Sequence, residues 1–211
     1  MNETTQATTK ERNTFLAFSR CATRTVENHI ETQSPRQYIV RAYLHRVVEL
    51  QESVALSLSS KRYATAWALL RTLQESALNG MYLAELAPDT TVAFVLARLV
   101  LTEPIILPMK PKAIARELAK KVSNLHGLGN ITSKWWKILC DNTHGNPSAL
   151  PLSLIGGSVP LDPELKKMII VHAVGPTMSF LAIAEDHKVF DKKTEDHART
   201  VFFGTELLKE L

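Results

Sequence analysis

The residues best suited to acid–base chemistry lie in one stretch, residues 133–144. This stretch is expected to be helical because Gly145 and Pro147 follow it as stop signals. At 100° per residue, four of its polar side chains fall within a sector of about 80° on one helix face. A histidine beside a carboxylate and two ammonium groups can transfer protons on a phosphodiester, while a lysine stabilises the phosphoryl charge. The four residues are Lys134, Lys137, Asp141 and His144.

Each of these side chains also has a purely structural explanation. His144 would lie in the last helical turn, where an imidazole can bind the free carbonyl groups and is favoured by the negative end of the helix dipole. Asp141 is four residues from Lys137, so the two can simply form an exposed ion pair worth a few tenths of a kcal/mol. The sequence leaves open whether this face is catalytic.

A second candidate pair is Arg71 and Glu75, which are four residues apart within a very apolar helical stretch. One interpretation is a partly buried ion pair that fixes helix register. In another, Arg71 reaches a phosphate group in a cleft and joins the catalytic candidates. In a third, the same helix face, which also carries Trp67, Leu78 and Tyr82, meets a second copy of the chain.

Positive charge is concentrated between residues 110 and 137, where seven basic residues accompany a single acidic one, Glu117. The formal net charge of the whole chain is only +4. Such a segment is typical either of solvated lysines on an outer helix face or of a surface that contacts a phosphate backbone. The candidate nucleic-acid contacts are Lys112, Arg116, Lys120, Lys121 and Lys134.

The composition is that of an ordinary folded protein, with 211 residues of which 45% are hydrophobic and 22% charged. The N-terminus lacks the apolar run of a secretory signal. The longest apolar stretch without Asp, Glu, Lys or Arg, residues 168–184, is interrupted by Gly175-Pro176 and falls short of a membrane span. We therefore expect a soluble, cytoplasmic protein that does not bind membranes.

No motif indicates a metal or an organic cofactor. The sequence contains no Gly-rich phosphate loop, no G-x-S-x-G turn, no H-E-x-x-H and no paired C-x-x-C, and no two of its seven histidines lie four residues apart. Its two cysteines, Cys21 and Cys140, are far apart and indicate neither a disulfide framework nor a metal quartet. We expect no cofactor and no metal.

Apolar residues recur at helical spacing along most of the chain, so we expect an all-α antiparallel bundle of five to seven helices. Residues 1–12 are polar and are expected to form a disordered tail, which leaves 13–211 as one helical domain with a long loop at 145–161. Residues 92–101 are apolar on nearly all sides and are expected to be buried. The longer expected helices span 15–30, 35–58, 63–86, 162–185 and 194–208.

Two stretches resemble a bacterial helical family of unknown function that is grouped with the HEPN-like domains. The first, residues 62–86, contains a Leu-Leu-Arg run at 69–71 with a glutamate four residues after the arginine. The second, residues 135–150, is a Trp-rich helix that ends in the turn Thr143-His144-Gly145. The resemblance covers about residues 13–190.

This resemblance implies a HEPN-like fold. Active members of that group are homodimeric, metal-independent ribonucleases of toxin–antitoxin and phage-defence systems, with an arginine four to six residues before a histidine. Here His144 corresponds to the histidine, Lys137 is the nearest upstream cation, and Arg71 is an alternative phosphate-binding group. The implied function is RNA binding or cleavage in bacterial defence or stress. The alternatives are a non-catalytic module that binds a partner protein or nucleotide, and a small-molecule binder capped by loop 145–161.

Overall fold

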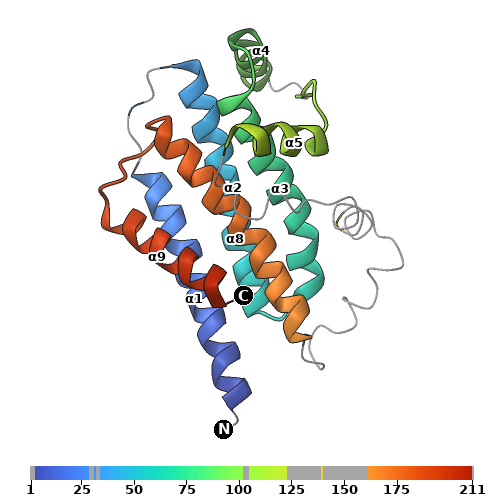
Figure 1. The fold of residues 1–211 in the computed structure, drawn as a ribbon, viewed down its shortest axis with the longest axis vertical. Coiled ribbons are helices and arrows are strands. Elements are labelled where there is room, and N and C mark those ends of the chain that lie inside the picture. The colour runs from blue at the N-terminus through green and yellow to red at the C-terminus, as the bar shows by residue number, and fades with distance from the viewer. Residues whose placement is uncertain are drawn as a thin grey trace.

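The computed structural model describes residues 3–28, 31, 34–101, 105–122, 139 and 161–210. Within these residues the chain forms seven helices and no strand, as the sequence predicts (Figure 1). The fold is therefore an all-α helical bundle. Its helices are α1 (Glu3–Glu27), α2 (Pro35–Ser59), α3 (Tyr63–Glu85), α4 (Asp89–Val100), α5 (Pro111–Lys121), α8 (Pro163–Asp186) and α9 (Glu195–Glu210).

Helix α3 is the central helix of the bundle. It packs most extensively against α2, and also against α8 and α5, while α1 and α9 pack against each other on the far side of α2 and α8. Most of the α3 residues from Ala66 to Ala84 are buried. Figure 1 shows α4 and α5 at the end of the bundle opposite the N-terminus. Most polar side chains on α3 are therefore packed against neighbouring helices.

Local capping signals set the starts of two long helices. Ser34 and Gln37 form a capping box at the start of α2, in which the Ser34 hydroxyl accepts from the Gln37 backbone N–H and the Gln37 side chain accepts from the Ser34 backbone N–H. The Asp162 carboxylate accepts from the backbone N–H groups of Glu164 and Leu165 at the start of α8. Pro176 lies inside α8, which continues to Asp186.

Buried polar side chains connect the helices where they cross. Gln51 of α2 is fully buried, and its amide donates to the Ser19 hydroxyl of α1 at 3.3 Å and accepts from the Thr177 hydroxyl of α8 at 3.2 Å. Because an unpaired buried amide would cost free energy, these partners favour a single register of the three helices. On the other side of the bundle, the Thr25 hydroxyl of α1 lies 3.2 Å from the Thr200 hydroxyl of α9.

The expected burial of residues 92–101 is wrong. Phe94, Val100 and Leu101 are 50%, 73% and 64% exposed, and only Val92 and Val95 of α4 are buried. The physical reason is that α4 lies at the end of the bundle and packs mainly against one helix, α2. The apolar composition of α4 therefore does not mean that other helices cover it.

Helix α1 begins at Glu3, within the polar residues 1–12. Extending an existing helix costs little, and this segment contains no Gly or Pro to stop it. The expectation that one face of α3 meets a second copy of the chain differs from the structure. Trp67, Leu78 and Tyr82 are all buried within the bundle, so they cannot contact a second copy.

Helix α8 is long and apolar enough, by length and composition, to cross a membrane. In its most apolar window, 67% of the residues are buried inside the bundle. This burial is what the core helix of a soluble protein shows, and among the described residues no other helix passes the same criterion.

The closest helix contact in the core is at Gly80. A Cβ atom added there would lie 2.3 Å from Phe180 Cζ of α8 and 2.8 Å from Tyr43 Cβ of α2. The Tyr43 Cβ is joined directly to the backbone, so α2 itself would have to move. At Gly204 the nearest atom is Sδ of Met178, at 2.6 Å, which belongs to a flexible side chain.

We therefore predict that Gly80→Ala destabilises the protein by about 1–3 kcal/mol, the cost of overpacking a tight core. Gly204→Ala is the matched control, since both residues are helical and the Met178 side chain can rotate away. Urea unfolding of the two variants measures the difference. A Gly80→Ala variant as stable as the wild type would show that the three helices do not approach this closely.

Candidate functional site

Arg71 and Glu75 form the ion pair that their spacing predicts. The distance from Arg71 Nε to Glu75 Oε1 is 3.0 Å, and the two side chains are 19% and 33% exposed. Both residues lie on the side of α3 that is least covered by other helices of the described chain. Because a largely buried charge needs a partner, Glu75 holds the guanidinium in one orientation.

A half-buried histidine that the sequence did not indicate, His172 of α8, contacts Gln74 of α3. The amide nitrogen of Gln74 donates to the backbone carbonyl of His172 at 3.3 Å and faces His172 Nδ1 at 3.2 Å. The backbone carbonyl of His172 can only accept a hydrogen bond, so the group that faces it is the Gln74 amide nitrogen, a donor. The same nitrogen also faces His172 Nδ1, so Nδ1 must be an acceptor as well. The proton of the neutral ring is therefore on Nε2. Burial lowers the pKa of His172, so that the ring is neutral at pH 7.

No sequence signal would have singled out His172, because it is a lone histidine in an apolar helix with no partner at helical spacing. Its partner Gln74 is 98 residues away along the chain. Only the packing of α8 on α3 brings the two together.

The other catalytic candidates, Lys137, Asp141 and His144, lie outside the described residues, as does Lys134. Leu139, which belongs to the same stretch, is described: it is helical and only 2% exposed. It is part of the buried cluster that also contains Trp67 of α3 and Ile170 of α8.

The basic residues of α5 are exposed, but they are not equivalent. Lys120 pairs with Glu117 at 2.7 Å, and Lys121 pairs with Glu85 of α3 at 3.3 Å. Within the described part of the chain, Lys112 and Arg116 have no acidic partner. Two of the predicted nucleic-acid contacts are therefore already engaged in ion pairs.

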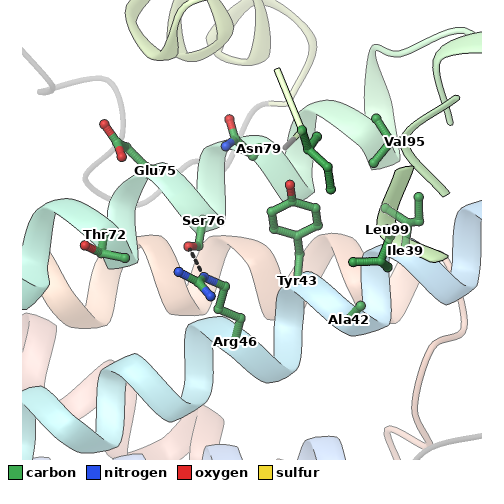
Figure 2. A pocket seen from close by; sticks show the side chains of 11 residues that line it. Ile39, Ala42, Tyr43, Arg46, Thr72, Glu75, Ser76, Asn79, Val95 and Leu99 are labelled. Carbon is green, nitrogen blue, oxygen red and sulfur yellow. Dashed lines mark hydrogen bonds between the residues drawn. The ribbon is translucent and has the colours of Figure 1, made fainter. Parts of the chain in front are cut away.

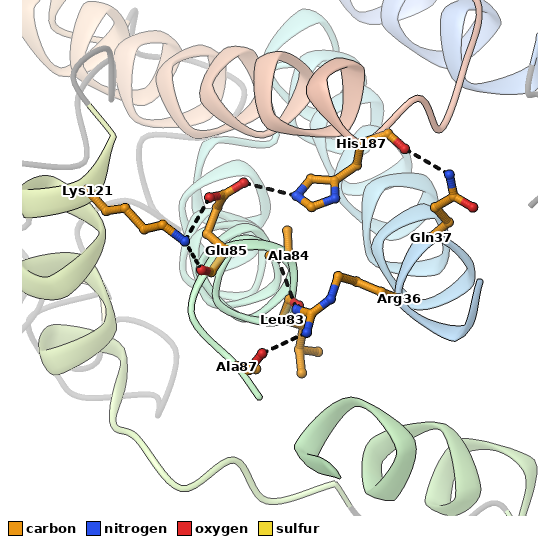
Figure 3. Close-up of polar contacts among 8 residues, drawn as sticks. All are labelled: Arg36, Gln37, Leu83, Ala84, Glu85, Ala87, Lys121 and His187. Carbon is orange, nitrogen blue, oxygen red and sulfur yellow. Dashed lines mark hydrogen bonds and ion pairs between the residues drawn. The ribbon is translucent and has the colours of Figure 1, made fainter. Parts of the chain in front are cut away.

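Glu85 is the point at which α5 and the end of α8 are attached to α3 (Figure 3). Its carboxylate lies 2.9 Å from His187 Nε2 and 3.3 Å from Lys121 Nζ, and Lys121 also donates to the Glu85 carbonyl. Burial alone would raise the pKa of Glu85, but the hydrogen bonds from His187 and Lys121 outweigh it, so that the pKa lies below its usual value.

The same end of α3 is capped by an arginine from α2. Arg36 donates to the carbonyls of Leu83, Ala84 and Ala87, at and just after the end of α3 (Figure 3). It also forms an ion pair with Asp89 at 2.6 Å. A cation here also meets the negative end of the helix dipole. The charged groups around residue 85 thus have a structural role.

A cavity of about 330 Å³ opens beside the Arg71–Glu75 pair, between α2, α3 and α4 (Figure 2). Glu75 lies on its wall, and Arg46 of α2 donates from Nε to the Ser76 hydroxyl of α3 at 3.1 Å across it. Within the described residues, no group of three or more His, Cys, Asp or Glu side chains is arranged to hold a metal ion.

Comparison of the chain with protein-family models, with curated proteins and with solved structures finds no match. The functional argument therefore rests on the residues described above.

We predict that Glu85→Gln lowers stability at pH 7 by about 1–2 kcal/mol, because it removes a carboxylate that two partners hold ionised. The pKa of Glu85 is depressed on folding, so its contribution is complete above the unfolded value of about 4.3 and is lost as the pH falls through the lower folded value. Urea unfolding between about pH 7 and pH 3 should therefore show the wild type and variant converging in acid.

Glu117→Gln is the matched control, because among the described residues Glu117 pairs only with the exposed Lys120. This substitution should change stability by less than about 0.5 kcal/mol. A difference between wild type and Glu85→Gln that stays constant over this pH range would contradict the account of Glu85.

Proposed function

We propose that this chain is an RNA-directed protein of bacterial defence or stress that works in the cytoplasm. In this proposal Arg71 contacts the reacting phosphate, and His144 transfers the proton, assisted by Lys137 and Asp141. Such a reaction needs a general acid–base and a cation at the phosphoryl group, and no metal.

The observation that carries the proposal is the Arg71–Glu75 pair. A guanidinium held at Nε by a carboxylate is already oriented, so little side-chain entropy is lost when it binds a phosphate. Its position on α3, a helix buried along most of its length, keeps that orientation fixed. A flexible surface arginine would lack both properties.

The proposal connects Arg71 with the stretch 133–144, to which Leu139 belongs. Leu139 and Trp67 are buried in the same cluster, and Trp67 precedes Arg71 by about one helical turn on α3. Residues two to five positions from Leu139 in the sequence include Lys137, Asp141 and His144. The proposal requires these three side chains to act on the same phosphate as Arg71.

The exposed cations Lys112 and Arg116 would contribute weaker contacts to the RNA backbone. Lys120 and Lys121 would contribute less, because binding would have to compete with Glu117 and Glu85 for their ammonium groups.

The proposal predicts that the purified protein cleaves structured RNA in the presence of EDTA. His144→Ala should lower the rate on the order of 10²–10⁴-fold, since it removes the proton-transfer group. Arg71→Lys keeps the charge but not the bidentate geometry and should also lower the rate, without loss of fold. Gel-based cleavage of a mixture of structured RNAs measures both.

His126→Ala is the control, because His126 belongs to neither candidate stretch. Circular dichroism and urea unfolding of each variant separate a lost reaction from a lost fold. No cleavage by the wild type, or equal cleavage by His144→Ala, would contradict the enzymatic proposal.

The exposed face of α4 favours a second candidate function, the binding of a partner protein. Phe94 and Ile106, which are 50% and 80% exposed, line one surface hollow, and Val100 and Leu101 are exposed as well. Exposed apolar surface that gathers in this way is typical of interaction sites. If the partner is a second copy of the chain, wild-type protein will sediment as a dimer. A protein that dimerises but cleaves no RNA would favour this non-catalytic module.

A further inference from the structure

We propose that the cavity between α2, α3 and α4 binds a small amphipathic anion, a molecule with an apolar body and a carboxylate or phosphate head. The cavity has a volume of about 330 Å³, which is within the range of small-molecule sites. Its two ends differ in chemistry, and this difference determines the class of ligand. This site is separate from the RNA reaction proposed above, because its anion-binding residue would be Arg46.

The apolar end is formed by side chains from three segments of the chain. Ile39 of α2, Val95 and Leu99 of α4, and Ile105 after α4 line it (Figure 2). Leu99 is 41% exposed, so part of this wall is in contact with water when the cavity is empty. Filling the cavity with an apolar group would remove that surface from water, which favours binding.

The polar end carries Arg46, which has no carboxylate partner within the described residues. Arg46 uses Nε to donate to the Ser76 hydroxyl, and within the described residues its two terminal nitrogens make no hydrogen bond or ion pair. Glu75 on the same wall is already neutralised by Arg71 at 3.0 Å. The Arg71 guanidinium thus offsets the charge of Glu75, and the two parallel terminal N–H groups of Arg46 suit a carboxylate or phosphate.

Tyr43 stands between the two ends. Figure 2 shows its ring rising from α2 across the cavity, with the hydroxyl pointing away from α2 on the side of Asn79. Burial raises the pKa of this phenol, so it stays neutral and can donate to an anion. Its Cβ is fixed by the close approach at Gly80, which makes this wall rigid.

The test uses the full chain and three probes with the same apolar body: octanoate, octyl phosphate and octylamine. Isothermal titration calorimetry and ligand-observed NMR measure their binding. We expect octanoate and octyl phosphate to bind with a stoichiometry of one, and octylamine to bind at least tenfold more weakly. The comparison of octanoate with octyl phosphate determines which head group is preferred.

Two variants test the two ends of the cavity. Arg46→Gln should weaken octanoate at least tenfold, whereas Arg41→Gln, on the same helix but outside the cavity lining, should not. Leu99→Trp places an indole in the apolar end and should abolish binding of both anions, and the exposure of Leu99 makes it tolerant of the larger side chain.

Equal binding of octylamine and octanoate, an unchanged affinity in Arg46→Gln, or no binding of either anion at millimolar concentration would each overturn the proposal. RNA cleavage by Arg46→Gln should equal that of the wild type. Failure of the cavity proposal is therefore distinguishable from failure of the proposed RNA reaction.

Discussion

The contact of α2, α3 and α8 at Gly80 determines how much of α3 is covered. With no side chain at this position, Phe180 and Tyr43 approach the α3 backbone from two directions. Both neighbouring helices then bury the apolar residues of α3 on each side. The polar residues Arg71 and Glu75 are left on the remaining side, where Glu75 borders the cavity. A larger residue at position 80 would move the helices apart and change both features together.

Buried polar contacts fix the register of the helices, which apolar contacts alone do not specify. Gln51 holds α1, α2 and α8 to one register, and Gln74 does the same for α3 and α8 through His172. At the end of α3, Glu85 attaches α5 through Lys121. The basic face of α5 is thus positioned by an acid on α3, and the same ion pair reduces the net positive charge of this face.

The sequence predicted the helices well where their signals are local. The Ser34-Gln37 capping box and the Asp162 cap mark two helix starts within four residues of sequence, and the Arg71–Glu75 pair follows from helical spacing alone. Features that depend on distant segments were missed. The exposure of α4 depends on which helices reach it, and the cavity combines residues 39–46, 72–79, 95–99 and 105. No local pattern encodes either.

The central claim is that α3 is the rigid element that holds both the Arg71–Glu75 pair and the polar end of the cavity. Native-state hydrogen exchange measured by mass spectrometry tests it most directly. The account predicts that amides of residues 70–83 in α3 exchange only through global unfolding, with a free energy equal to that from urea unfolding, while α4 exchanges much faster. Exchange in α3 as fast as in α4 would contradict it.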